Sequence, residues 1–377
     1  MDLQGLRQYF KKQKTDFIKL MEQMIGFQTH SGNRQSINRF VGFLENLFGK
    51  LSLKGIRTST PVGDIIRFDY QPDFSEFLVL LAHMDTVKTG NEPPAARVKG
   101  SLLYGNGAYD MKNGIALFYS VIRACRDLGI TPGKNLTLLF NPDEENGSPC
   151  SGPVLEKICR NARAVLLPEP SCPDGGIKTR RKGVVSVKAR LRGKTSHSGI
   201  EPEKGLDANR GLASLIVLID SILADHPGVT FNPGIISGGN QTNMVSGISE
   251  LRGEIRSFSN EEIKRVSNKL ENIRNIQDIA IHLETEVVHP PLEPTPVSTR
   301  LYSLARKISK ALGNELHECG SGGSSDGSSL SELGIPVLDG LGMIGGGAHS
   351  DREYIDVSDF AFRATLLTAL CQEISHG

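Results

Sequence analysis

Long apolar runs are absent from this 377-residue sequence. No run approaches the roughly 18 apolar residues that a membrane-spanning helix needs, so no segment is predicted to cross a bilayer. The N-terminal stretch MDLQGLRQYFKKQKTDF lacks the apolar centre of a secretion signal, so we expect a cytoplasmic protein. An excess of charge is also absent, since the formal net charge is +1. Nothing therefore indicates nucleic acid or a membrane as the main partner.

Paired cysteine motifs are absent as well. None of the six cysteines belongs to a C-x-x-C pair, and a chain of this size does not need disulfides to fold. We therefore interpret all six as reduced thiols that mostly pack in the interior: Cys125, Cys150, Cys159, Cys172, Cys319 and Cys371.

Four short apolar runs define the first predicted domain. They cover residues 77–82, 136–140, 164–167 and 335–338. Helical spacing of apolar residues precedes and separates them, with helices expected at about 4–27, at 34–50 and after 113. Buried strands that alternate with helices indicate an α/β fold with a mainly parallel sheet flanked by helices.

A second pattern interrupts the first. A strand from 183 is followed by a predicted helix at 205–224 and by two strands at 228–237 and 248–258. A second helix at 260–275 and a last strand at 279–288 complete the block. This β-α-β-β-α-β order is ferredoxin-like. The basic KTRRKG and the proline-rich HPPLEPTP flank it as hinges. We therefore expect one domain from residues 1–182 and 293–377, and an inserted domain over 183–292.

Groups that can bind metal follow each of the four apolar runs. His83 and Asp85 come after the first run, and Glu169 comes after the third. The second run leads into NPDEENGS, and the fourth leads to His349. Asp110 lies just before the helix predicted after residue 113. Because sites in open parallel sheets form outside the carboxyl ends of the strands, we expect these groups to lie close together.

Each of these signals is weak alone, because a single histidine at a strand end is usually structural and the Glu144–Glu145 pair is usually solvated. Their convergence is informative. Crowded carboxylates would repel by about 4 kcal/mol per close pair at an effective dielectric of ~20. A divalent cation removes this repulsion, and imidazole with carboxylate suits zinc. A dinucleotide site at GNGAYD is rejected, because Gly105 and Gly107 lack a third glycine at the required spacing.

Five motifs resemble, in the same order, those of the two-zinc aminoacyl-amide hydrolase family: LLAHMDTV, GNGAYDMKNG, NPDEENGS, TSHSG and GGGAHSDREYI. This family includes glutamate carboxypeptidase of the carboxypeptidase G type, acetylornithine deacetylase and succinyl-diaminopimelate desuccinylase. The resemblance extends from about residue 15 to the end of the chain. GGNQTNMVSG, RGEIRS and GGSSDGSSL are most similar to the glutamate carboxypeptidase branch. The resemblance implies a zinc-peptidase-like catalytic domain with an inserted lid and dimerisation domain.

The resemblance implies two zinc ions per chain, with cobalt or manganese as substitutes. His83 and Glu169 would bind one ion, Glu145 and His349 would bind the other, and Asp110 would bridge both.

Two neighbours of these ligands receive supporting roles by the same resemblance. Asp85 would accept a hydrogen bond from the ring of His83, since a spacing of two residues on a strand places both side chains on one face. Glu144 diverges from Glu145 and would act as the general base.

In the inserted domain the resemblance implies that His197 stabilises the oxyanion in the active site of a partner subunit, which requires a homodimer. Arg256 would bind the substrate carboxylate beside Asn243, and Gly322 and Gly323 would let the backbone approach the ligand. From the residues alone, His197 is equally a surface histidine and Arg256 an edge-strand residue.

Two features keep alternatives open. The four cations within residues 178–182 form either a solvated hinge or a contact for an acidic substrate side chain. Asp326 is either part of the ligand-binding loop or a helix N-cap.

We therefore expect a dizinc hydrolase that cleaves an amide bond next to a free carboxylate. Its substrate would be a small peptide, and glutamate is a candidate for the released residue. An N-acyl amino acid deacylase uses the same chemistry and is the alternative. A catalytically idle ligand-binding protein is a third interpretation, against which the presence of all five predicted ligands and Glu144 argues.

Overall fold

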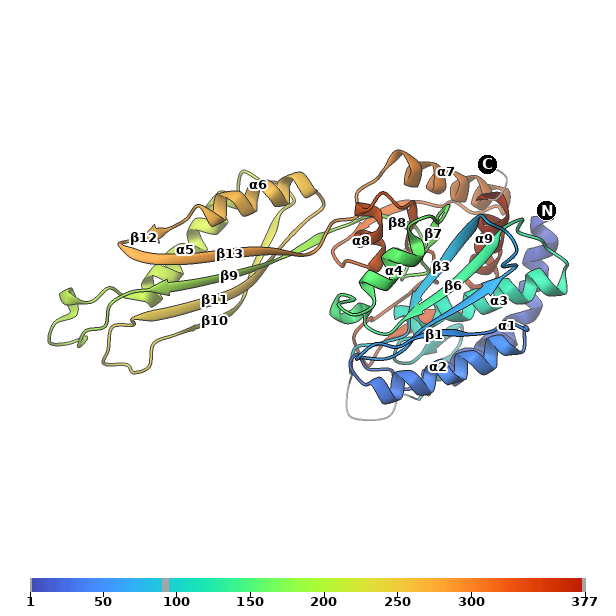
Figure 1. Ribbon diagram of the computed structural model, residues 1–377, viewed down its shortest axis with the longest axis horizontal. Helices are drawn as coiled ribbons and strands as arrows, with labels where there is room; N and C mark the ends of the chain where they lie inside the picture. Colours follow the sequence, from blue (N-terminus) through green and yellow to red (C-terminus); the bar gives the residue numbers. More distant parts are fainter. Residues whose placement is uncertain (1, 90–94, 375–377) are drawn as a thin grey trace. The chain divides into compact units, whose positions relative to one another are not determined.

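The computed structural model describes residues 2–89 and 95–374 and divides into two compact units (Figure 1). The first unit contains residues 1–179, 294–320 and 325–377, and the second contains residues 180–293 and 321–324. These exchange points lie a few residues from the predicted 182/183 and 292/293. The short return at 321–324 was not anticipated.

The first unit is built on a six-stranded sheet in the order β1-β2-β6-β3-β7-β15. Its strands are β1 (Ile56–Thr58), β2 (Ile65–Tyr70), β3 (Phe77–His83), β6 (Asn135–Asn141), β7 (Val165–Leu166) and β15 (Val337–Leu338). The four strands from β6 to β15 run parallel, and β1 and β2 add an antiparallel edge. The four predicted apolar runs are therefore the parallel part of the sheet.

Apolar side chains from helices of this unit bury one face of this sheet. Leu78 and Leu80 of β3 and Leu136 and Leu138 of β6 share a core with residues from α1, α2, α3, α7 and α9. The helices of this unit are α1 (Leu3–Ile25), α2 (Arg34–Gly49), α3 (Asn113–Asp127), α4 (Gly152–Cys159), α7 (Pro296–Ala311), α8 (Asp326–Glu332) and α9 (Phe360–Glu373). Among the described residues, no helix is long and apolar enough to cross a membrane.

Short strands hold the loops around the carboxyl edge of the large sheet. A four-stranded sheet has the order β16-β17-β5-β4, and a two-stranded sheet joins β14 to β8. Their bounds are β4 (Arg97–Lys99), β5 (Leu102–Tyr104), β16 (Gly345–Gly346), β17 (Tyr354–Asp356), β8 (Ile177–Arg181) and β14 (Glu318–Ser321).

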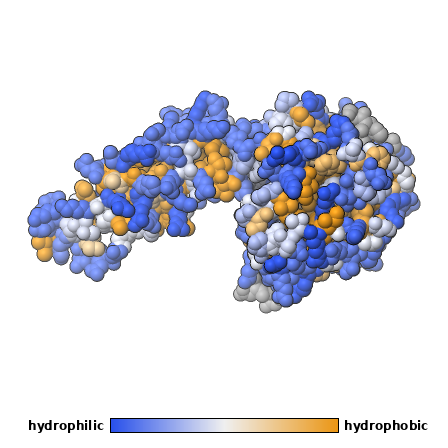
Figure 2. Space-filling view, viewed as in Figure 1, coloured by the Kyte–Doolittle hydropathy of each residue, from blue (hydrophilic) through white to orange (hydrophobic). Residues whose placement is uncertain are grey.

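The second unit has the predicted ferredoxin-like order of elements. Its antiparallel sheet runs β10-β11-β9-β13-β12 and carries α5 and α6. The bounds are β9 (Gly183–Arg192), α5 (Ala208–Leu223), β10 (Thr230–Gly238), β11 (Ile248–Ser257), α6 (Asn260–Glu271), β12 (Asn275–Ile276) and β13 (Ile279–His289). Alternate residues of β9 are buried, as the period-two pattern requires. Figure 2 shows apolar side chains on the surface of this unit among the polar ones.

One expectation about the cysteines is wrong. Cys172 and Cys319 form a disulfide within the first unit, although 147 positions separate them in the sequence. Because Cys172 follows β7 and Cys319 lies in β14, the fold brings together two thiols that no local motif connects. Of the other four cysteines, only Cys150 is not buried.

Candidate metal centre

The candidate ligands lie at one edge of the six-stranded sheet because its central strands run in the same direction. His83 is the last residue of β3 and lies opposite Asn141, the last residue of β6. Glu145 lies on the turn η2 (Glu144–Asn146) that follows β6, and Glu169 follows β7. The polar residues at or after the carboxyl ends of these buried strands therefore lie at the same edge of the sheet.

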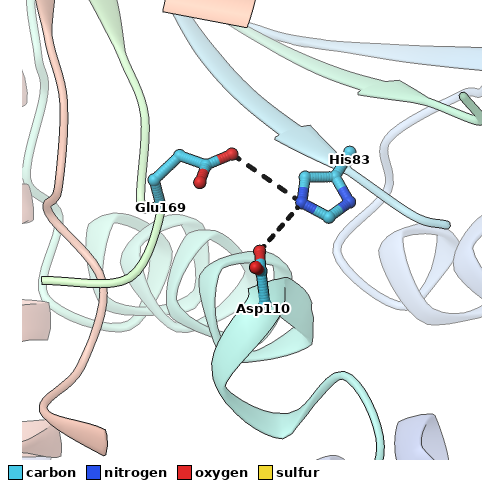
Figure 3. Close-up of side chains that lie close together, drawn as sticks. All are labelled: His83, Asp110 and Glu169. Carbon is cyan, nitrogen blue, oxygen red and sulfur yellow. Dashed lines mark hydrogen bonds and ion pairs between the residues drawn. The ribbon is translucent and has the colours of Figure 1, made fainter. Parts of the chain in front are cut away.

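Figure 3 shows the side chains of the first group of ligands close together, and two of the three are buried. His83 Nε2 lies 3.1 Å from Asp110 Oδ1 and 3.7 Å from a carboxylate oxygen of Glu169. The side chains of His83 and Glu169 are 1% and 6% exposed, and that of Asp110 is 17% exposed. One ligand atom from each residue lies within 4.8 Å of the others, which is close enough for one metal ion.

The second group shares Asp110 with the first. His349 Nε2 lies 3.1 Å from Glu145 Oε2 and 3.4 Å from Asp110 Oδ2. The ligand atoms of these three residues also lie within 4.8 Å of one another. The two oxygens of Asp110 thus face different histidines. This group is more open, because the side chain of His349 is 51% exposed. The backbone of His349 has a left-handed φ of 61°.

The cluster contains more carboxylates than histidines, so the two histidines balance only part of its negative charge. Burial lowers the pKa of His83, but Asp110 and Asp85 outweigh it and the net pKa lies well above the usual range. Hydrogen bonds to Asp110 and Glu145 raise the pKa of His349 to about 10. The pKa of Asp110 is lowered, because the two histidines overcome the effect of its burial.

The residues present fit two divalent cations. Glu145 Oε1 is buried and has no hydrogen-bond partner among the described residues. A carboxylate oxygen buried without a partner is costly, and a cation at this position would satisfy it. The donor set, two imidazoles and three carboxylates, suits zinc and related ions.

Glu144 lies beside the first group without joining it. Its carboxylate is 12% exposed, and Oε2 lies 4.0 Å from His83 Nε2. Burial raises its pKa well above the usual value, and the negative charges of Glu169, Asp326 and Glu145 add to the effect.

Asp85 contacts both His83 and the turn η2. His83 Nδ1 lies 2.9 Å from the backbone oxygen of Asp85 and 3.5 Å from its carboxylate. The carboxylate also accepts hydrogen bonds from the backbone N–H of Glu144 (3.1 Å) and Glu145 (3.2 Å) and from the hydroxyl of Ser31 (2.6 Å). Asp85 therefore contacts the ring through its backbone and its carboxylate, and the carboxylate also holds the turn η2.

Two other carboxylates were misread or missed. Asp326 is the first residue of α8 and Ser325 is the N-cap, so the interpretation of Asp326 as the cap is wrong. Its carboxylate accepts hydrogen bonds from Asn141 Nδ2 (2.8 Å) and from the hydroxyl of Ser148. Sequence reasoning also missed Glu353, which binds the loop of Asp110. Its only signal was its position in the motif of His349.

In the second unit, Arg256 forms contacts of its own. Its Nε lies 2.8 Å from Glu254 Oε1, Nη2 lies 3.2 Å from Glu254 Oε2, and Nη1 donates to the backbone oxygen of Gly322 (2.7 Å). A Cβ at Gly322 would meet no heavy atom within 4 Å, and one at Gly323 would meet only the Ser321 hydroxyl at 3.9 Å. These two glycines border open space.

His197 and Asn243 lie on neighbouring exposed loops of the second unit. His197 pairs with Met244, and the backbone oxygen of Asn243 accepts a hydrogen bond from Ser198. The Nδ1 of His197 accepts from the backbone N–H of Gly199 at 3.2 Å. Since Nδ1 is an acceptor, the neutral ring carries its proton on Nε2, which is free to act as a donor.

The basic stretch at 178–182 does not act as one surface. Arg181 is buried and donates to the backbone oxygens of Gly323 and Ser324. Arg180 and Lys182 each lie 5.6 Å from the centre of the Phe258 ring.

Comparison with known proteins places these features in context. A sequence model described as Peptidase family M20/M25/M40 matches residues 79–373. Carboxypeptidase G2 of Pseudomonas sp. (strain RS-16) is 28% identical over 372 residues, covering 96% of this chain and 89% of that protein. The succinyl-diaminopimelate desuccinylase of Aliarcobacter butzleri is 24% identical over 365 residues, covering 91% and 95%.

Solved structures of low sequence identity share the fold. The aminopeptidase PepT of Bacillus cereus superposes with a TM-score of 0.81 at 21% identity, covering 96% of this chain and 98% of that chain. The YXEP protein of Bacillus subtilis, described as a dinuclear metal-binding peptidase, superposes with a TM-score of 0.71 at 14% identity, covering 97% and 99%.

Proposed function

The chain belongs to peptidase family M20/M25/M40 and is a hydrolase of that family, and from this premise we propose that it is a dizinc carboxypeptidase. It would hydrolyse the amide bond next to a free terminal carboxylate and release an amino acid, with glutamate as the first candidate. The observation that carries the proposal is that two groups of side chains, each able to hold a metal ion, share Asp110.

Five residues would hold the two ions. His83 and Glu169 would bind the first, Glu145 and His349 the second, and Asp110 both. Bound divalent ions acidify water and polarise carbonyl oxygens. The proposal of two ions is supported by the unpartnered Glu145 Oε1 and by the description of the Bacillus subtilis relative. Zinc is proposed because of the mixed imidazole and carboxylate ligands.

Glu144 would be the general base. It would accept a proton from the attacking water and then donate it to the nitrogen of the leaving amine. Its position supports this role, because Glu144 Oε2 lies 4.0 Å from His83 Nε2, beside the first group of ligands. The hydrogen bond from its backbone N–H to Asp85 would hold it in place during the exchange.

Arg256 would recognise the carboxylate of the substrate, with Asn243 as a second donor and Gly322 and Gly323 allowing close approach. A guanidinium matches a carboxylate as a bidentate fork. Glu254 already occupies that fork from one side, which keeps the guanidinium oriented before substrate binds.

A homodimer formed through the second unit would supply His197 to the active site of the partner subunit. Its Nε2–H would donate to the developing oxyanion. Exposed apolar side chains on β10 support an interface at this free edge of the sheet, since Ile235 and Ile236 are 62% and 55% exposed. An unpaired strand edge with apolar side chains is a natural surface for association.

An N-acyl amino acid deacylase is the second candidate, because desuccinylases are among the relatives of the chain. The same ligands and the same base would cleave its substrate. Only the acyl group differs, so the residues of the first unit do not favour either substrate.

The test is a panel of dipeptides and N-acyl amino acids offered to zinc-loaded protein. Dipeptides with a C-terminal glutamate should be cleaved faster than N-acetyl or N-succinyl amino acids. The opposite ranking would establish the deacylase. Full activity in protein shown by elemental analysis to be metal-free would contradict the proposed function, and metal-loaded protein that cleaves nothing in the panel would favour a ligand-binding role.

A further inference from the structure

The loop that carries Asp110 is bound by a carboxylate with no assigned role. Glu353 is 2% exposed, and its carboxylate accepts three backbone hydrogen bonds. The donors are the N–H groups of Gly107 (2.6 Å), Tyr109 (2.8 Å) and Asp110 (2.8 Å). Three backbone hydrogen bonds to one buried carboxyl group restrain the loop.

A buried lysine contacts the same loop through one carbonyl group. Lys112 is fully buried, and its Nζ donates to the backbone oxygens of Phe27 (2.8 Å) and Asn106 (3.4 Å). Glu353 therefore binds N–H groups of the loop, and Lys112 binds one of its carbonyl oxygens. Neither group is a candidate ligand, and neither has a role in the proposed proton transfer.

Glu353 also belongs to the segment that carries His349, four residues earlier in the chain. The carboxylate of Glu353 thus joins the backbone of Asp110 to the loop of His349. The side chains of these two candidate ligands approach closely, with His349 Nε2 at 3.4 Å from Asp110 Oδ2. His83 and Glu169 do not depend on this contact, because they follow β3 and β7. The restraint acts on the second group of ligands more than on the first.

We propose that Glu353 is a positioning residue that sets Asp110 and His349 at the separation needed to hold the second metal ion. This inference rests on the proposed two-metal function. It assigns Glu353 a specific effect, because its loss should weaken one of the two metal positions and leave the other comparatively strong. Supporting residues of this kind typically change metal affinity by about 10- to 100-fold.

The experiment compares E353Q with wild type in zinc titrations against a chromophoric chelator, together with activity as a function of free zinc. Glutamine keeps the shape, but its amide has one acceptor oxygen where the carboxylate has two. We expect two bound zinc ions in both proteins. In E353Q the dissociation constant of the more weakly bound ion should be about 10- to 100-fold higher than in wild type. Activity of E353Q should recover as free zinc is raised, a response that a purely structural defect would not give.

A matched control is D69N. Asp69 lies in β2, at the end of the β2–β6 pair far from the turn η2, and its carboxylate accepts from Arg67, Asn135 and Thr137. It should leave both zinc affinities unchanged. If E353Q does not fold, E353D decides, because it keeps the charge but shortens the reach and should raise the same dissociation constant.

The outcomes separate the two proposals. Two zinc ions with wild-type affinities in E353Q, or an equal loss at both positions that excess zinc does not restore, would overturn the role of Glu353 alone. Wild-type protein that binds fewer than two ions would instead overturn the two-metal function on which the inference rests.

Discussion

The two units hold their candidate residues in opposite ways. In the first unit the side chains of His83 and Glu169 are 1% and 6% exposed and lie within a network of ion pairs. In the second unit His197 and Asn243 are exposed and bonded only through local loop contacts. Burial fixes the geometry of a reacting group in advance, whereas an exposed group acquires a fixed partner only when a ligand or another chain binds. We therefore expect substitutions in the first unit to remove the metal ions or the base, and substitutions in the second unit to remove contacts with the substrate.

The strongest test of this contrast is Asp110→Ala, since both groups of ligands depend on this carboxylate. We expect at least one metal ion to be lost, the other to be held poorly, and activity to fall by roughly 10⁴-fold or more. Elemental analysis and single-turnover kinetics measure the two effects. A variant that retains two tightly bound ions would show that Asp110 is not shared.

The next test separates two adjacent residues of the first unit. Glu144→Gln keeps the shape and removes the base, so metal content should persist while kcat falls by roughly 10²- to 10⁴-fold. Glu145→Gln should instead weaken one metal ion. Metal analysis of both variants beside their kcat values distinguishes the roles, and near-normal turnover in Glu144→Gln would rule out its role as the base.

A smaller effect is expected at Arg256 in the second unit. Arg256→Ala and Arg256→Lys should lower kcat/KM by roughly 10- to 150-fold, the equivalent of about 1.5–3 kcal/mol for a charged hydrogen bond. Metal content should not change.

Pairing this change with a change in the substrate sharpens the test. Wild-type enzyme should discriminate against substrates whose terminal carboxylate is amidated, and Arg256→Ala should lose most of that discrimination. If the effects of substitution and amidation are simply additive, Arg256 does not contact that carboxylate.

The smallest expected signal is a rescue. Glu144→Gln and His197→Ala chains should each be inactive, but a mixed dimer would contain one site with both groups intact. With random exchange of subunits, roughly a quarter of wild-type activity should return. Confirmed mixed dimers without such activity would mean that His197 acts within its own subunit or not at all.

The contrast also explains what could be predicted from the sequence. The buried strands β3 and β6 are continuous apolar runs, so the polar residues that follow them, such as His83 and Glu145, could be assigned to one edge of a sheet before any coordinates. The ferredoxin-like order of the second unit was predictable from its alternating strands. Whether the assigned residues bind metal and substrate stays a prediction.

Long-range contacts could not be predicted. Glu353 resembles any charged residue of a surface loop until the fold buries it against the loop of Asp110. The carboxylate of Asp85 lies 3.5 Å from His83 Nδ1, but its hydrogen bonds from the two backbone N–H groups of the turn η2 could not be predicted. The hydrogen bonds from Asn141 and Ser148 to Asp326 join residues 185 and 178 positions apart, beyond the range of any local pattern.

The Cys172–Cys319 disulfide has a topological consequence. The two cysteines flank the insertion, so the bond closes the chain between them into a covalent ring that contains residues 180–293 of the second unit. A protease that cuts once anywhere in that ring opens it without separating the fragments. Such a nicked chain would migrate as one species until a reductant is added, and it would then divide into two.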